Sequence, residues 1–130
     1  MIDIKDFLLN VLKENIDDSF TEYAFSDKNQ KEEKSLYISN MVDQDNEKLF
    51  YPLYYKQNIS IVVRWETNYT ETRKKATEIY DYIKSISRVL LNEDTLIIRC
   101  VMLDKFPIDY RSKTKIYAQE IRFQVQYTTK

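Results

Sequence analysis

Apolar side chains recur every three or four residues in two stretches of this chain, which is the spacing that lines one face of an α-helix. The first stretch covers residues 2–16, where the apolar stripe runs from Ile4 to Ile16 and Asp3 can cap the start of the helix. The sequence therefore predicts a short opening helix with one buried face.

The second stretch covers residues 69–91 and carries the stronger helical pattern. Asn68 and Glu71 have the spacing of a capping box at its start. Its apolar positions step by four, three, four and three residues, through Ala76, Ile79, Ile83, Ile86 and Leu90. We expect one helix over this whole range, followed by Asn92 in the left-handed conformation that glycine usually takes after a helix.

Five further stretches are rich in β-branched and aromatic residues, which is typical of strands. They are residues 20–25, 35–41, 58–66, 95–103 and 116–129. The stretch 95–103 is apolar on both sides, which predicts an interior strand. The last stretch alternates an apolar row with a polar row, Ile121, Phe123, Val125 and Tyr127 against Arg122, Gln124 and Gln126. Its apolar row is expected under the helices, whereas its polar row needs water or a partner.

The order of these elements predicts an α+β fold. We expect a single domain over residues 1–130, with one mixed, mainly antiparallel sheet of four to five strands packed against the two helices. The step from residues 58–66 through the second helix into 95–103 suits a crossover between parallel strands. Residues 104–115 suit the enlarged tip of an antiparallel hairpin.

The composition removes most kinds of catalytic chemistry. The 130 residues include no histidine and no glycine, and Cys100 is the only cysteine. Without histidine there is no imidazole base and no histidine-ligated zinc, and without glycine there is no glycine-rich phosphate loop. Cys100 lies in an apolar strand, where we expect a buried and unreactive thiol. We therefore expect no enzyme activity, no catalytic residues, and no cofactor or metal site.

Charge and hydropathy narrow the choice of partners. The net charge is −1, so the chain lacks the basic excess that nucleic-acid binding needs. Arg73, Lys74 and Lys75 form a small basic cluster, which we expect to be a solvated helix face. No apolar run approaches the ~18 residues of a membrane span, and the N-terminus lacks a signal-peptide pattern. We expect a protein that is made in the cytoplasm, is not secreted by a signal peptide and does not enter membranes.

Carboxylates leave one catalytic alternative open, a small metal-dependent nuclease. Such a site needs an aspartate together with an acidic residue two positions before a lysine. Glu32, Glu33 and Lys34 supply the second part, and Asp27 or Asp43 would supply the first. Because this run lies in a hydrophilic connection rather than a dry pocket, the nuclease ranks behind the non-catalytic interpretations.

Aromatic residues gather in two connections, at residues 50–55 and 106–110 of a chain with eleven tyrosines and six phenylalanines. Either these rings lie over the sheet edge with their hydroxyl groups in water, or they contact another subunit, because aromatic residues and arginine are enriched in interfaces. A stacking platform for nucleic acid would need basic residues between the rings, and acidic residues stand there instead. The predicted subunit or tube contacts are Phe50, Tyr51, Leu53, Tyr54, Tyr55, Phe106, Ile108, Tyr110 and Arg111.

Several local features together resemble the tail terminator proteins of long-tailed bacteriophages and phage-derived elements, also described as tail completion or minor capsid proteins. They are the opening helix IDIKDFLLNVLKENI, the tyrosine-rich lead-in LYYKQNISIVVRW, the helix YTETRKKATEIYDYIKSI and the terminal strand IYAQEIRFQVQYTT. The resemblance covers nearly the whole chain as a pattern of elements. Members of that family commonly carry glycine in their loops, and this chain has none.

The resemblance implies a structural virion assembly protein, located in the tail of a virion or in a phage-tail-like particle. It would form a homo-oligomeric ring, usually a hexamer, on the last ring of the tail tube, stop tube polymerisation, and offer the head–tail joining surface. Its partners would be itself, the tail-tube protein and the head–tail connector protein. The alternative from another class is a monomeric adaptor or inhibitor domain that binds one other protein.

Overall fold

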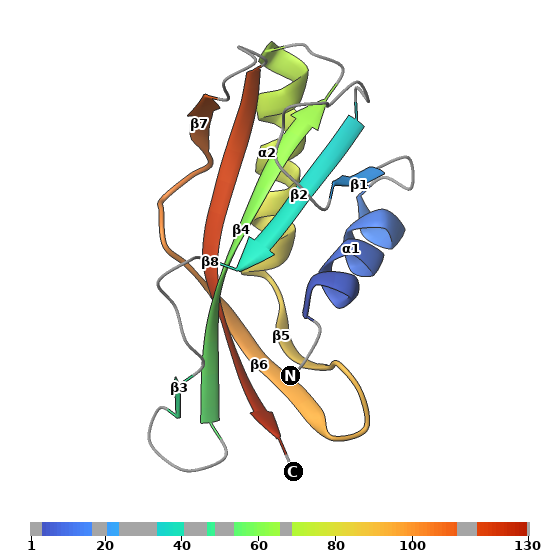
Figure 1. Ribbon diagram of the computed structural model, residues 1–130, viewed down its shortest axis with the longest axis vertical. Coiled ribbons are helices and arrows are strands. Elements are labelled where there is room, and N and C mark those ends of the chain that lie inside the picture. The colour runs from blue at the N-terminus through green and yellow to red at the C-terminus, as the bar shows by residue number, and fades with distance from the viewer. Residues whose placement is uncertain are drawn as a thin grey trace.

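The computed structural model describes residues 4–16, 21–23, 34–40, 47–48, 54–65, 69–111 and 117–129, and it arranges them as two helices beside one sheet (Figure 1). In chain order the described elements are α1 (Ile4–Asn15), β1 (Thr21–Tyr23), β2 (Lys34–Asn40), β3 (Glu47–Lys48), β4 (Tyr54–Trp65), α2 (Tyr69–Lys84), β5 (Ser87–Leu90), β6 (Thr95–Met102), β7 (Ile108–Arg111) and β8 (Tyr117–Thr129). The predicted α+β class is confirmed. The described sheet has eight strands rather than four or five, because short strands such as β3 and β7 are too brief to leave an alternating pattern in the sequence.

The centre of the sheet is an antiparallel pair of long strands, β4 and β8. Their register sets Ile61 opposite Ile121 and Ile59 opposite Phe123, and all four side chains are buried. On the far side of β4 lies β2, and on the far side of β8 lie β6 and β7, one after the other. The described pairs are antiparallel apart from β1 with β2, so the sheet is mixed and mainly antiparallel, as predicted.

Both helices bury their apolar stripes in the same core. Leu8 and Leu12 of α1 and Ile79 and Ile83 of α2 are fully buried there, together with the apolar row of β8. In Figure 1, α2 lies behind β4 and β8, and α1 lies beside β2. Neither described helix combines the length and the hydropathy that a membrane-spanning helix needs.

Thr72 joins the start of α2 to the end of β4. Its hydroxyl group donates to the carbonyl oxygen of Trp65 at 3.0 Å and accepts from the backbone N–H of Trp65 at 3.1 Å. Thr72 is fully buried, so these two hydrogen bonds are shielded from water.

The chain then passes through α2 to β6, which runs parallel to β4 because both are antiparallel to β8, the strand between them. This connection is the predicted crossover between parallel strands, and β8 lies between the two strands.

The second helix is shorter than the sequence predicts. It ends at Lys84, and residues 87–90 instead form β5, in a hairpin with β6. Leu90 was expected on the buried stripe but is 68 % exposed. The left-handed residue is also misplaced in the prediction, since it is Arg88, with φ of 55°, and not Asn92. Asn92 lies in the β5–β6 turn, where its side-chain oxygen accepts from the N–H of Asp94 at 2.8 Å.

Candidate functional site

The predicted contact residues that the structure describes lie near opposite ends of β8. Tyr54 and Tyr55 begin β4 and stand opposite Thr128 and Tyr127, whereas Tyr110 of β7 stands opposite Ala118. A separation of nine residues along an extended strand corresponds to roughly 30 Å. The structure therefore divides the predicted contacts into two groups. The remaining calls at the first group, Phe50, Tyr51 and Leu53, lie outside the described residues.

Tyr55 is partly used within its own chain. Its ring stacks on that of Tyr127, with ring centroids 5.5 Å apart and an interplanar angle of 17°. Tyr127 is buried, and burial together with the neighbouring Tyr55 raises its pKa. Tyr55 is half-buried at the margin of the core, so only part of its ring is available to a partner.

The second group is more accessible. Phe106 is 65 % exposed, in the bend that leads into β7. Ile108 and Tyr110 are half-buried and share the sheet face that is opposite the helices, because they pair with Glu120 and Ala118. Arg111, the last residue of β7, stands opposite Tyr117.

The second group belongs to a longer open edge of the sheet, which we define as residues 100–111. The hairpin partner β5 reaches only to Ser87, opposite Arg99. Beyond that point, no described strand pairs with residues 100–102 on the side away from β8. The prediction that 95–103 is wholly interior is therefore wrong for its last part. A strand that is apolar on both sides lies at an edge here, because the chain leaves α2 and begins β5 only at Ser87, opposite Arg99, so β5 does not cover the last residues of β6.

Exposed apolar side chains gather along this open edge. In the described part of the chain, five large apolar residues are exposed, and three of them lie within the open edge: Val101 (39 %), Leu103 (43 %) and Phe106 (65 %). Phe106 is among the predicted contact residues, whereas Val101 and Leu103 are not, since nothing in their spacing distinguishes them from core positions. Neighbouring apolar groups left in contact with water are typical of an interaction surface.

Hydrogen bonds hold the bend of the open edge in place. Arg122 donates from Nε and Nη2 to the two carboxylate oxygens of Asp104, at 2.9 and 2.8 Å. The hydroxyl group of Tyr80 donates to the backbone carbonyl of Asp104 at 2.7 Å. The bond to Asp104 raises the pKa of Arg122, while burial and the nearby carboxylates of Asp104 and Asp81 raise the pKa of Tyr80. The edge is therefore preformed by contacts to α2 and β8.

A groove of about 660 Å³ lies between the end of α2 and the open edge. We call it the edge groove, and its principal lining residues are Tyr80, Lys84, Arg99, Met102, Leu103 and Lys105. Cys100 also borders it but is only 7 % exposed, and burial raises the pKa of its thiol to about 12. The thiol is protonated at neutral pH, which confirms the expected buried cysteine and gives the groove no nucleophile.

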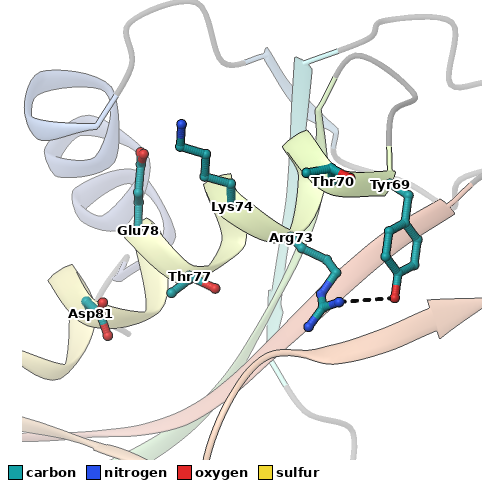
Figure 2. Close-up of a pocket in the computed structure, with 7 residues that line it drawn as sticks. All are labelled: Tyr69, Thr70, Arg73, Lys74, Thr77, Glu78 and Asp81. Carbon is teal, nitrogen blue, oxygen red and sulfur yellow. Dashed lines mark hydrogen bonds between the residues drawn. The ribbon is translucent and has the colours of Figure 1, made fainter.

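A second depression, of about 470 Å³, lies along the exposed side of α2. Figure 2 shows that α2 alone supplies the side chains that border it, and that Lys74 and Glu78 extend away from the direction taken by Arg73. Arg73 donates to the hydroxyl of Tyr69 at 3.3 Å. These exposed groups do not converge on one point, so the depression is a solvated helix face. The basic cluster behaves as expected at Arg73 and Lys74, but Lys75 lies 4.4 Å from the ring centroid of Trp65.

The polar row of β8 is largely satisfied by its own neighbours. Gln124 donates to Asn58 at 3.1 Å, Gln126 donates to Gln124 at 2.8 Å, and Arg99 donates to Gln126 at 2.7 Å. These bonds link β4, β8 and β6 across the sheet face that is opposite the helices. The polar row of β8, which was expected to need water or a partner, therefore finds hydrogen-bond partners within its own chain.

The acidic residues of the nuclease alternative lie outside the part of the chain that the structure describes. They are Asp27, Glu32, Glu33 and Asp43, whereas Lys34 is described as the first residue of β2, opposite Trp65. Within the described ranges, no group of three or more acidic or cysteine side chains is placed to hold a metal ion.

Comparison with known proteins gives no family. The chain matches no protein-family model, and no curated protein is significantly similar to it.

Proposed function

We propose that this protein is a structural assembly protein of the tail terminator kind, which forms a ring on a tail tube and joins tail to head. The observation that carries the proposal is the open edge, where Val101, Leu103 and Phe106 expose apolar surface on a preformed backbone. Aromatic and aliphatic groups of this kind become the buried centre of a subunit interface.

The positions of the two contact groups support a ring rather than a two-fold dimer. A closed ring needs two different patches on each subunit, which meet head to tail. Tyr54 and Tyr55 lie near one end of β8, and Tyr110 lies near the other, roughly 30 Å away by strand geometry. Two separated patches on one rigid sheet suit a subunit that contacts one neighbour at each end.

Substitution of two predicted aromatic contact residues tests the proposal. We expect Phe106→Ala and Tyr54→Ala to keep the circular dichroism spectrum of the wild type but to weaken assembly by about 2 kcal/mol per interface, because each removes a predicted aromatic anchor. Size-exclusion chromatography with light scattering measures the assembled fraction against protein concentration.

Tyr69→Ala is the matched control, since Tyr69 is also an exposed aromatic residue, 52 % accessible, but lies on α2. It should assemble like the wild type. Normal assembly of both Phe106→Ala and Tyr54→Ala would show that the contact residues are wrongly chosen. A wild-type protein that stays strictly monomeric would favour the adaptor alternative.

A further inference from the structure

The edge groove carries an excess of positive charge in a chain whose net charge is −1. Lys84 and Lys105 border it with exposed side chains, whereas Arg99, which also borders it, donates from Nε to Gln126 on the sheet face opposite the helices. The one carboxylate among its lining residues, Asp104, is bound by both nitrogen donors of Arg122. Asp81 lies nearby on α2 but borders the other depression. The charge of the groove is therefore complementary to an acidic partner.

The groove also offers backbone hydrogen-bonding groups. The N–H of Leu103 donates to the carbonyl of Arg122 at 3.0 Å, so the backbone of Leu103 faces β8. Backbone groups alternate sides along an antiparallel strand, and the N–H and C=O of Met102 consequently face away from β8, toward the groove. No described strand pairs with Met102 on that side. An extended peptide can take this position by adding to the sheet edge.

The arrangement of the charges distinguishes between possible occupants. A small anion is best held by donors that converge in a buried site, whereas Lys84 and Lys105 are exposed and border an open groove from different elements. A second copy that paired through the same edge would bring like charges together, which is how lysine protects sheet edges from self-pairing. An acidic extended chain meets neither objection.

We propose that the edge groove binds an extended acidic segment of a partner protein. The segment adds to the edge through the backbone of Met102, and its carboxylates meet Lys84 from α2 and Lys105 from the sheet side. The apolar side chain of Met102, which shares the helix side of the sheet with Phe123, supplies the floor. This interaction does not require the ring, because each monomer carries the complete groove.

Fluorescence anisotropy with labelled eight-residue peptides tests the proposal. The probe is an alternating valine–glutamate peptide, and its two controls are the valine–lysine peptide and the valine–glutamate peptide with N-methylated alternate residues. We expect the first probe alone to bind, with an affinity that falls as salt is added. N-methylation blocks edge pairing without changing the charge, so it separates strand addition from simple attraction.

Single substitutions locate the binding. Lys84→Glu and Lys105→Glu should each weaken binding about 10-fold by replacing attraction with repulsion, whereas Lys74→Glu, an equal charge change elsewhere on α2, should leave it unchanged. Circular dichroism checks that each variant is folded. Equal effects of the three variants would overturn the proposal, as would equal binding of the N-methylated peptide.

Two further results would assign the groove to another occupant and so overturn the proposal. One is displacement of the labelled peptide by inorganic phosphate as effectively as by the unlabelled peptide, compared at equal total charge. That result would indicate a small-anion site. The other is self-association of the wild type that Lys84→Glu and Lys105→Glu abolish, which would indicate a second copy in the groove.

Discussion

Arg88 takes a left-handed backbone conformation, with φ of 55°, in a chain that has no glycine to place there. This conformation costs a residue with a Cβ atom about 1–2 kcal/mol. Glycine avoids that cost, but part of the resulting gain in stability is offset because glycine makes the unfolded chain more flexible. We expect Arg88→Gly to raise the free energy of unfolding by about 0.5–1 kcal/mol. Urea denaturation measures the change.

Arg73→Gly is the control for that substitution, because Arg73 is exposed within α2. Glycine there should lower the free energy of unfolding by about 1 kcal/mol. A loss of stability of similar size in Arg88→Gly would mean that the left-handed backbone carries no strain.

Cys100 makes the stability depend on pH in the alkaline range. Burial raises the pKa of its thiol from 9.0 to about 12, so between these values the folded state keeps a proton that the unfolded state loses. The contribution of the buried neutral thiol is therefore complete below pH 9 and is lost as the pH rises toward 12. We expect the advantage of the wild type over Cys100→Ala in free energy of unfolding to shrink between pH 8 and 10.5.

The comparison is made by urea unfolding under reducing conditions. Tyr80 and Tyr127 also have raised pKa values, but they are present in both proteins and cancel in the difference. An advantage that stays constant across this pH range would contradict the buried, protonated thiol.

Among the contacts between secondary-structure elements, the two hydrogen bonds of Thr72 connect α2 to the end of β4. Thr72→Val keeps the shape of the side chain but removes both hydrogen bonds to the backbone of Trp65. We expect a loss of about 1–3 kcal/mol in the free energy of unfolding, because polar backbone groups lose partners in a buried place. Thermal and urea unfolding measure it. Thr77→Val, at an exposed position of the same helix, should change the stability little, and equal losses in the two variants would exclude this role for Thr72.

The sequence pattern predicts those elements whose burial is regular. The alternation in β8 places Phe123 and Val125 in the core, and the helical stripe places Ala76, Ile79 and Ile83 there. The stripe fails after Lys84, because its apolar spacing continues into residues 87–90 although the chain turns into a hairpin. A spacing of three and four is compatible with a helix but does not require one, and pairing with β6 decides the outcome.

The candidate site is less predictable for the same reason. Phe106 stands out because it lies in a polar connection, whereas Val101 and Leu103 belong to a strand that reads as interior. Their exposure depends on where β5 begins relative to β6. That starting point is set by the position of α2 in the tertiary structure, which periodicity does not encode.

In the whole molecule, one sheet holds the two groups of predicted contact residues at a fixed separation. The long strands β4 and β8 both contribute side chains to the core. The end of β8 pairs with the start of β4, and the beginning of β8 pairs with β7 of the open edge. Such a subunit can contact a neighbour at each end.

The mass of the purified wild-type particle distinguishes a closed ring from a monomer and from an open polymer. Native mass spectrometry over a range of concentrations should show one closed assembly, and for a hexamer of the 15.8 kDa chain its mass is about 95 kDa. A closed ring gives a single dominant mass above its assembly threshold. A mass of 15.8 kDa at every concentration, or an unlimited ladder of sizes, would contradict a ring-forming terminator.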